Sequence, residues 1–280
     1  MIVALQYYEG DRQRTFSLAR LLADIEPSPR NDVLLALVCQ PDTPRSKLTD
    51  FTIQYCSLKF PVVHVVSPRG AIGHPEGCGQ LWAGTMEHFA HLFNQKLVPP
   101  HDSILTLDGS DGVPLHLDWL DLMIEEQSRT LSSGKLISGS PYNLWDCPLH
   151  VNPNAIFHLS MLNKCPSLHT IPKPNGTLLT HFDIYHRRAM LSNASLSSLV
   201  RTDWHGAGNS ISLELMREKA SRSVWLHGYK DDNLYEEARE HLFNRSPVPM
   251  NLQRYRLPDL YMAESCRKWP ERKNLQINSP

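Results

Sequence analysis

The first 131 residues alternate between short apolar runs rich in β-forming side chains and longer segments with the apolar spacing of amphipathic helices. The predicted strands cover residues 2–8, 33–39, 62–66 and 104–107, and the predicted helices cover about residues 12–25, 45–55, 80–97 and 119–131. Strands that alternate with helices need long crossover connections, which place the strands parallel to one another. The sequence therefore predicts an α/β fold, with a Rossmann-related, mainly parallel sheet and helices on both faces.

The second half of the chain is less regular than the first. Prolines interrupt it from residue 135 onward, although residues 223–226 form a predicted strand and residues 233–243 a predicted helix. The C-terminal residues are rich in Pro and Arg and are expected to lie on the surface. The expected organisation is a single domain of residues 1–245, with an irregular second half of residues 132–245 laid over residues 1–131, and a C-terminal extension of residues 246–280.

Composition and charge exclude several classes of protein. The formal net charge is −1, so the chain has no global attraction to nucleic acid or to anionic membranes. The N-terminus lacks the basic segment of a signal peptide, and no apolar run approaches the ~20 residues of a membrane span. The 6 cysteines form no CxxC pair, which is typical of reduced thiols. These features predict a cytoplasmic protein.

Two acidic residues follow the fourth predicted strand, in the segment Asp108-Gly-Ser-Asp111-Gly. Ligands of open α/β sheets bind outside the carboxyl ends of the strands. Neighbouring carboxylates repel each other unless a cation lies between them, and hard divalent ions prefer oxygen ligands. The pair therefore indicates a metal site, although Asp and Gly also form ordinary turns without any ligand.

A second polar segment, His227-Gly228-Tyr-Lys230, follows a late apolar run. His227 is a candidate nitrogen ligand for a Mn²⁺ or Mg²⁺ ion that carboxylates otherwise hold. Lys230 is a candidate point charge for a phosphate group. The alternative interpretation is a β-turn with a surface lysine. The glycine fingerprint GxGxxG of dinucleotide-binding folds is absent after the first strand, which argues against an NAD enzyme.

These two segments resemble motifs of GT-A glycosyltransferases, in which an Asp-x-Asp metal motif follows the fourth strand of a Rossmann-like sheet. The acidic turn stands in that place with one additional residue, and the late segment resembles the His-x-Gly-x-x-Lys signature of metal-dependent glycosyltransferases related to glycogenin. The resemblance implies a UDP-sugar donor and a bound Mn²⁺ or Mg²⁺. It implies Asp108, Asp111 and His227 at the metal, with Asp108 also near the donor ribose, and Gly228 and Lys230 at the donor phosphates.

The same resemblance assigns roles to the two halves of the chain. Residues 1–131 would be the nucleotide-sugar-binding half, and residues 132–245 the acceptor-side half. The end of the first strand, where GT-A proteins contact the nucleoside, carries Tyr8, Glu9 and Asp11. Tyr8 is a candidate for stacking on uracil.

Further candidates lie in loops and at predicted helix starts. Arg69, in a Gly/Pro-rich loop, and Gln80, at the following helix start, are candidates for donor binding because a helix N-terminus favours anions. Asp183 and Asp203 are the candidates for the catalytic carboxylate that acts as a base and deprotonates an acceptor hydroxyl. Asp146 is a further candidate in an acceptor loop. The alternative for Asp183 and Asp203 is a structural role as helix caps.

Most of the chain resembles a set of phage and bacterial proteins that share an early YYxGD segment, an acidic turn followed by Val-Pro-Leu, and a late HGxKD segment. This resemblance implies sugar transfer to 5-hydroxymethylpyrimidine in phage DNA, such as 5-hydroxymethylcytosine, in the host cytoplasm. A base taken out of the duplex could stack on His181, Trp145 or Trp204. The basic residues that could contact DNA phosphates are Arg187, Arg188, Arg217, Lys219, Arg222 and those between residues 254 and 273.

Other functions fit the same motifs. The acceptor could be a cell-surface glycan or a lipid rather than DNA. The acids could instead serve a metal-dependent nucleotidyltransferase or phosphoesterase, which sugar transfer without phosphoryl transfer would exclude. An inactive nucleotide-sugar-binding module would bind the donor without turnover.

Overall fold

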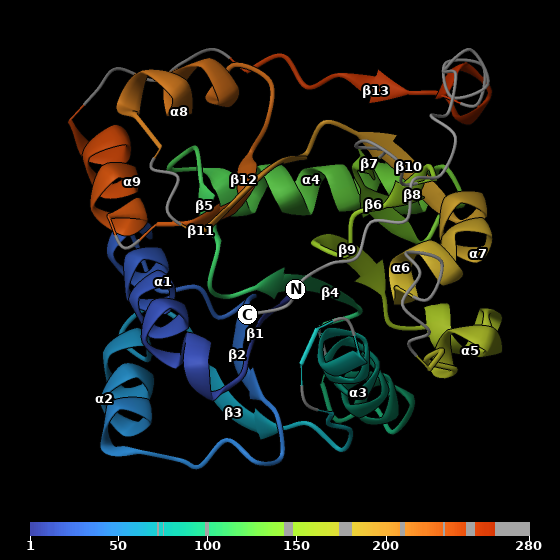
Figure 1. Cartoon of the computed structure of the whole chain (residues 1–280), viewed down its shortest axis with the longest axis horizontal. Helices are drawn as coiled ribbons and strands as arrows, with labels where there is room; N and C mark the ends of the chain where they lie inside the picture. Colours follow the sequence, from blue (N-terminus) through green and yellow to red (C-terminus); the bar gives the residue numbers. More distant parts are fainter. Residues whose placement is uncertain are drawn as a thin grey trace.

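The computed structural model describes residues 1–71, 73–74, 76–98, 101–142, 148–173, 181–207, 211–231, 233–244 and 250–260. Its first half follows the predicted alternation of strands and helices (Figure 1). The elements are β1 (Ile2–Tyr7), α1 (Arg12–Ile25), β2 (Leu34–Cys39), α2 (Lys47–Cys56), β3 (Val62–Val66), α3 (Glu76–Asn94) and β4 (Ser103–Asp108). A short 3₁₀ helix, Glu9–Asp11, joins β1 to α1. Every predicted strand and helix of this half is present, and only their ends differ.

The central sheet has eight strands in the order β13-β10-β6-β9-β4-β1-β2-β3. The four strands from β4 to β3 are parallel to one another, as the crossover connections require. The strands added by the second half are β6 (Ile137–Gly139), β9 (Ala155–His158), β10 (Ala194–Ser197) and β13 (Arg254–Tyr255). Strand β9 runs antiparallel between β4 and β6, and β13 is antiparallel to β10. The predicted mainly parallel α/β architecture is confirmed.

Helices cover both faces of this sheet, because alternate residues of a strand point to opposite faces. In β1, Leu5 belongs to a core that contains Phe16 of α1 and residues of α4 (Trp119–Ser132). Ile2, on the other face of β1, belongs to a second core with Trp82 of α3. Figure 1 shows α1 and α2 on one side of the parallel strands and α3 on the other. These two cores hold β1 and β4 rigidly, which fixes the position of the turn that follows β4.

A smaller sheet lies beside the end of β4. It contains β11 (Val200–Ala207), β12 (Trp225–Lys230) and β5 (Gly112–Pro114) in that order. Strand β12 is antiparallel to β5 and parallel to β11, and His227 lies opposite Gly112. The expected strand of residues 223–226 therefore extends through Lys230, and the alternative β-turn at His227 is wrong. Pairing with β11 and β5, which are distant in sequence, keeps this segment extended.

The second half otherwise contains short elements and connecting segments, as predicted. These elements are β7 (Pro141–Tyr142), β8 (His150–Val151), α5 (Met161–Lys164), a 3₁₀ helix (Pro166–His169), α6 (Phe182–Tyr185), α7 (Arg187–Ser192), α8 (Leu213–Ala220) and α9 (Leu234–Phe243). Among the described residues, no helix is both long enough and apolar enough to cross a membrane.

Candidate metal and donor site

The turn between β4 and β5 holds two carboxylates in different environments. Asp108 ends β4, and its Oδ1 accepts hydrogen bonds from the backbone N–H and the hydroxyl of Ser110, at 3.1 and 2.9 Å. Gly109 lies so close to α1 that a Cβ there would be 2.4 Å from the Cγ2 of Thr15. A larger residue would therefore push the turn away from α1. The glycine lets the turn lie against the helix and present Asp111 inward.

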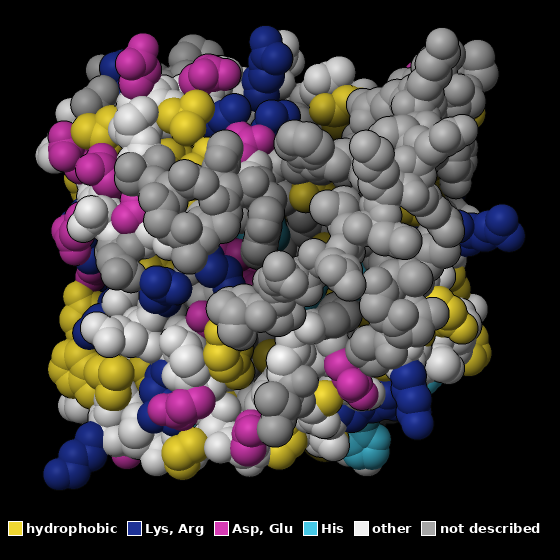
Figure 2. Space-filling model, in the orientation of Figure 1, with side chains coloured by type: hydrophobic (Ala, Val, Ile, Leu, Met, Phe, Trp, Pro, Cys, Tyr) yellow, Lys and Arg dark blue, Asp and Glu magenta, His cyan; other side chains and the backbone are white. Residues whose placement is uncertain are grey.

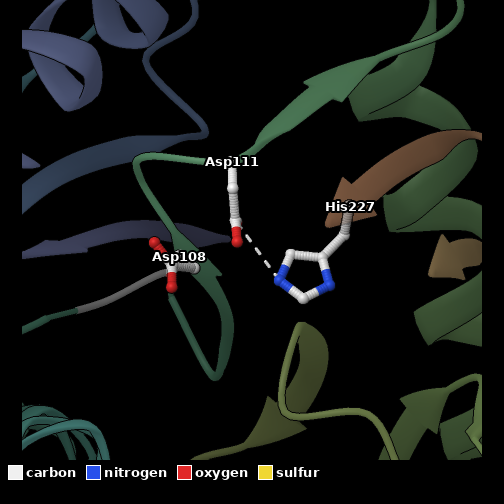
Figure 3. Close-up of side chains that lie close together, drawn as sticks. All are labelled: Asp108, Asp111 and His227. Carbon is white, nitrogen blue, oxygen red and sulfur yellow. Dashed lines mark ion pairs between the residues drawn. The ribbon is translucent and has the colours of Figure 1, made fainter. Parts of the chain in front are cut away.

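Asp111 is fully buried and faces His227 (Figure 3). One of its carboxylate oxygens, Oδ1, is 3.2 Å from Nε2 of His227. Its backbone carbonyl accepts hydrogen bonds from the N–H groups of Gly228 and Tyr229, at 2.9 and 3.2 Å. Gly228 has φ of 106°, a conformation that favours glycine. These backbone contacts attach β12 to the acidic turn and set the distance between the carboxylate and the imidazole.

The side chains of Asp108, Asp111 and His227 form what we call the acid–histidine cluster. Each offers one ligand atom, and these atoms lie within 4.8 Å of one another. Apart from the 3.2 Å contact with His227, no described residue donates a hydrogen bond to either carboxylate oxygen of Asp111. A buried carboxylate is costly unless a cation or hydrogen-bond donors compensate its charge. Two carboxylates and one imidazole suit a divalent ion such as Mn²⁺ or Mg²⁺, so the residues present fit the metal that the sequence predicts.

The charges of the cluster act on one another. Burial, followed by repulsion from Asp111, raises the pKa of Asp108 to about 6. Burial alone would lower the pKa of His227, but the charges of Asp111 and Asp108 outweigh it and raise that pKa. The pKa of Lys230 is also raised, because attraction to Asp108, Asp11 and Asp111 outweighs the effect of burial. The negative charge of the site is therefore concentrated where a metal ion and Lys230 can balance it.

The end of β1 contributes to the same site. The pKa of Asp11 is raised mainly by burial, although a hydrogen bond with Ser110 and attraction to Lys230 oppose the shift. The ring of Tyr8 is 47% exposed, and burial and Asp11 raise its pKa. Glu9 is exposed and forms an ion pair with Arg12. The structure thus brings Tyr8 and Asp11, but not Glu9, to the acid–histidine cluster.

Two predicted donor-binding residues lie elsewhere. Arg69 forms a two-point ion pair with Glu87 of α3, with Nε 2.7 Å from Oε2, and donates a hydrogen bond to the carbonyl of His169 at 2.8 Å. Gln80 is half-buried in the first turns of α3. Among the described residues, neither side chain contacts the acid–histidine cluster. The prediction of a donor contact is not supported for Arg69, because Glu87 and His169 already engage its guanidinium.

Two residues that the sequence did not single out lie nearer to the cluster. Cys78, at the start of α3, is exposed at the surface, and the charges of Asp108 and Lys230 act on its thiol. The charges of Asp183 and Lys230 act on His74, whose pKa is lowered mainly by burial. Both residues lie in the Gly/Pro-rich loop or at the helix start that the sequence indicated. A local pattern cannot distinguish them from Arg69 and Gln80, and a donor contact of these segments stays a prediction.

Asp183 lies in the first turn of α6, beside a group of histidines. One of its oxygens is 3.3 Å from Nε2 of His150, which is 2% exposed. Burial alone would raise the pKa of Asp183, but the hydrogen bond and the charge of His150 outweigh it and lower that pKa. The ring of His181 lies edge-on to the ring of His74, with centroids 4.9 Å apart. Asp183 is therefore an ionised carboxylate on the side of the site formed by the second half of the chain.

The remaining catalytic candidates differ from Asp183. Asp203 forms ion pairs with Arg201 and Lys219, at 2.8 and 2.9 Å, which is a structural role. Asp146 and Trp145 lie outside the described residues, and so does the side chain of Trp204. The structure thus favours Asp183 over Asp203.

Solved glycosyltransferase structures resemble this model. An active-site mutant of LgtC has a TM-score of 0.50 and 8% sequence identity, over 88% of this chain and 98% of that chain. A fragment of S. aureus TarS in complex with UDP-GlcNAc has a TM-score of 0.45 and 13% identity, over 79% of this chain and 64% of that chain. Mouse xyloside xylosyltransferase 1 has a TM-score of 0.47 and 10% identity, over 81% and 98%.

The chain spans 64%, 50% and 38% of the first three solved structures it matches, which are the TarS fragment, the bifunctional glycosyltransferase WbbM and TarS. No protein-family model matches the sequence, and no curated protein matches it. The likeness to LgtC shows that the chain has the fold of GT-A glycosyltransferases. At such low sequence identity the likeness concerns the fold, and the activity has to be argued from the site.

Proposed function

We propose that the chain is a metal-dependent glycosyltransferase, which moves a sugar from a UDP-sugar to a hydroxyl acceptor. The observation that supports this most directly is the buried Asp111, which faces His227 at the carboxyl end of β4 and has no other hydrogen-bond donor among the described residues. Open α/β sheets bind ligands at this edge. Two solved structures of a TarS fragment with a similar fold are complexes with UDP-GlcNAc and with UDP.

In this proposal the acid–histidine cluster holds Mn²⁺ or Mg²⁺. A bound divalent ion would neutralise the charge that develops on the diphosphate leaving group. Lys230, whose raised pKa keeps its ammonium charged, adds a second positive charge to the diphosphate. The positive φ of Gly228 allows the backbone of β12 to approach the phosphates without a side chain in the way. The chain thereby binds the donor and orients its leaving group.

The end of β1 is the proposed nucleoside subsite. The half-exposed ring of Tyr8 offers a face for the uracil, and Asp11 lies beside it with access to a ribose hydroxyl. Gln80 remains a weaker candidate for the donor. Arg69 is better explained as a structural residue that joins the loop after β3 to α3. The whole machinery is assigned to residues 1–245, with residues 246–280 as an extension, in a cytoplasmic enzyme.

Asp183 is the proposed base for the acceptor hydroxyl. Its lowered pKa keeps the carboxylate ionised, and His150 orients it through the 3.3 Å contact. The contact of His150 Nδ1 with the carbonyl of Pro148, at 2.7 Å, fixes the ring with its Nε2 edge toward Asp183. His181, which was predicted as a base-stacking group, lies beside Asp183 and is therefore proposed to contact the acceptor.

The acceptor proposed from the sequence is 5-hydroxymethylpyrimidine in DNA, and the structure adds little support for it. Several of the basic residues expected to contact phosphates already form ion pairs. Lys219 pairs with Asp203, and Arg254 pairs with Glu126. Figure 2 shows basic and acidic side chains interspersed among the described residues of the face that it draws. The basic side chains do not form one continuous patch there. A cell-surface glycan or a lipid therefore remains the alternative acceptor.

The test begins with the donor. The purified protein is incubated with Mn²⁺ and UDP-glucose, UDP-galactose or UDP-GlcNAc, and the release of UDP and of free sugar is measured with and without chelator. Metal-dependent release supports the proposal. Release of UMP would indicate a phosphoesterase, binding without release would indicate an inactive module, and neither binding nor release would overturn the proposal. Adding hydroxymethylated DNA and weighing the digested nucleosides then tests the acceptor.

A further inference from the structure

A buried turn between β8 and β9 links the two sides of the acid–histidine cluster. It consists of Asn152, Pro153 and Asn154, and both asparagines are 3% exposed. On one side, Oδ1 of Asn154 accepts a hydrogen bond from the backbone N–H of Asp108, at 2.8 Å. On the other side, Nδ2 of Asn152 donates a hydrogen bond to Oγ1 of Thr202 in β11, at 2.6 Å. The turn is therefore attached both to the end of β4 and to the neighbour strand of β12.

Hydrogen bonds inside the turn fix the orientation of the Asn152 amide. Its Oδ1 accepts from the backbone N–H and from the side-chain Nδ2 of Asn154, at 2.7 and 3.1 Å. Thr106 of β4 also donates its hydroxyl hydrogen to the carbonyl of Pro153, at 2.6 Å. Because the amide oxygen is already used, the NH₂ group of Asn152 must point to Thr202. Oγ1 of Thr202 is thus an acceptor in this contact.

Thr202 in turn meets the imidazole of the cluster. Its Oγ1 is 3.4 Å from Nδ1 of His227, while Nε2 of the same ring is 3.2 Å from Oδ1 of Asp111. A hydroxyl oxygen has two lone pairs, so Oγ1 can accept from Asn152 and from Nδ1–H of His227 at the same time. A hydrogen on Nδ1 leaves the lone pair of Nε2 directed at the acids.

We infer that Thr202, oriented by Asn152, is the positioning residue that holds His227 in the orientation and tautomer required for metal binding through Nε2. A ligating histidine typically donates its other N–H to an outer partner, and loss of that partner costs about 10–100-fold in metal affinity. The inference rests on the proposed metal-dependent function. It adds that the second half of the chain, through β11 and the turn of residues 152–154, controls the affinity of the donor site for metal.

The test compares two substitutions of similar size. Thr202→Val removes the acceptor oxygen and keeps the branched shape, whereas Thr202→Ser keeps the hydroxyl. The affinity for Mn²⁺ in the presence of UDP is measured from the electron paramagnetic resonance signal of free Mn²⁺. The expected results are a loss of about 10–100-fold for Thr202→Val and near wild-type affinity for Thr202→Ser.

A buried threonine elsewhere provides the matched control. Thr130 of α4 is fully buried and accepts a hydrogen bond from Ser138, at 2.6 Å. Thr130→Val should lower the melting temperature but leave the Mn²⁺ affinity unchanged. If Thr202→Val binds Mn²⁺ as tightly as the wild type, or if Thr130→Val weakens it equally, the inference is overturned while the proposed function stands. If the wild-type protein does not bind Mn²⁺ at all, both are overturned.

A second measurement does not depend on any variant of Thr202. In the ¹⁵N-labelled protein loaded with Mg²⁺ and UDP, long-range ¹H–¹⁵N spectra report which ring nitrogen of His227 carries the hydrogen. The signal is assigned by its absence from His227→Gln. A hydrogen on Nδ1 is expected, and a hydrogen on Nε2 would contradict the inference.

Discussion

At the scale of single residues, the two carboxylates of the acidic turn have different chemistry although only two residues separate them. Asp108 is partly exposed, and Ser110 satisfies one of its oxygens. Asp111 is fully buried and faces His227. The desolvation free energy of the carboxylate is therefore larger at Asp111 than at Asp108, and a bound cation would compensate more of it there. In the proposed metal site, Asp111 is therefore expected to be the principal carboxylate ligand.

This difference predicts the effect of Asp111→Asn. The substitution keeps the size of the side chain and removes its charge, so the fold should persist while metal-dependent UDP release falls by about 100-fold or more. Activity and thermal melting are measured together. The control is Asp118→Asn, an exposed acid before α4, which should leave both unchanged. A variant of Asp111 that keeps full activity in the presence of chelator would show that the metal assignment is wrong.

A second prediction concerns the metal-free protein and pH. The pKa of Asp108 is about 6 in the folded state, above its ordinary value of 3.8, so the folded state binds more protons than the unfolded state between these values. Stability in the presence of chelator should therefore fall as the pH rises from about 4 to about 6. Asp108→Asn removes this penalty, which is on the order of 1–3 kcal/mol, and still accepts from Ser110.

Urea denaturation in chelator checks this prediction at two pH values. At pH 7.5, Asp108→Asn should be more stable than the wild type, and near pH 4 the difference should disappear, because the wild-type carboxyl is then protonated. An equal difference at both pH values, or a destabilised variant at pH 7.5, would contradict it. Mn²⁺ affinity should fall in the same variant at neutral pH.

At the scale of elements, strand β12 shows how a local irregularity serves the site. Gly228 has φ of 106°, and its N–H donates to the carbonyl of Asp111. The pairing of β11 with β12 shifts register between Thr202 and Gly206, close to the same point. The irregular backbone allows β12 to follow β5 at His227 and still continue beside β11 to Lys230.

Gly228→Ala should therefore have two effects. An alanine side chain would be strained at this positive φ, and the strain costs on the order of 1–3 kcal/mol of folding free energy. The shifted backbone should also weaken the affinity for UDP with Mn²⁺. The comparison is Gly134→Ala, since Gly134 has φ of 76° after α4. That variant should lose stability without losing affinity. Calorimetry and urea denaturation separate the two outcomes, and equal affinities for both variants would remove the role proposed for Gly228.

At the scale of the whole molecule, the C-terminal segment completes the central sheet. Strand β13 pairs with β10 at the edge opposite β3. Arg254 in β13 lies 3.1 Å from the carboxylate of Glu126 in α4, which is 2% exposed and also pairs with Arg129. Residues 250–260, the described part of the extension, are thus attached to the rest of the fold through a strand and a nearly buried acid.

Arg254→Ala should lower the free energy of unfolding by about 1–2 kcal/mol, because Glu126 keeps only one of its two cationic partners. The melting temperature should fall by about 2–4 °C for each kcal/mol. Arg256→Ala is the matched control, since the ion pair of Arg256 among the described residues is with Asp259 on the surface. Its loss should change stability by less than about 0.5 kcal/mol. Equal melting temperatures for the two variants would show that the Arg254–Glu126 contact does not stabilise the chain.

The sequence by itself determined the alternation of strands and helices, the parallel half of the sheet and the place of the acidic turn. These features depend on local periodicity and on turn residues, which act over a few neighbours. The residues of the acid–histidine cluster could be named in advance for the same reason, because Asp108, Asp111 and His227 each follow or occupy an apolar strand. The motif resemblance supplied the expectation that they meet.

Only the tertiary structure decided which distant segments pair. Three contacts connect residues that are far apart in the chain. They are the antiparallel pairing of β9 with β4, the pairing of β5 with β12, and the turn that joins Asp108 to Thr202. Arg69 is an example, because no local pattern indicated its ion pair with Glu87 of α3, while its proposed donor contact stays a prediction. Long-range pairing depends on the packing of the whole core, which no local pattern encodes.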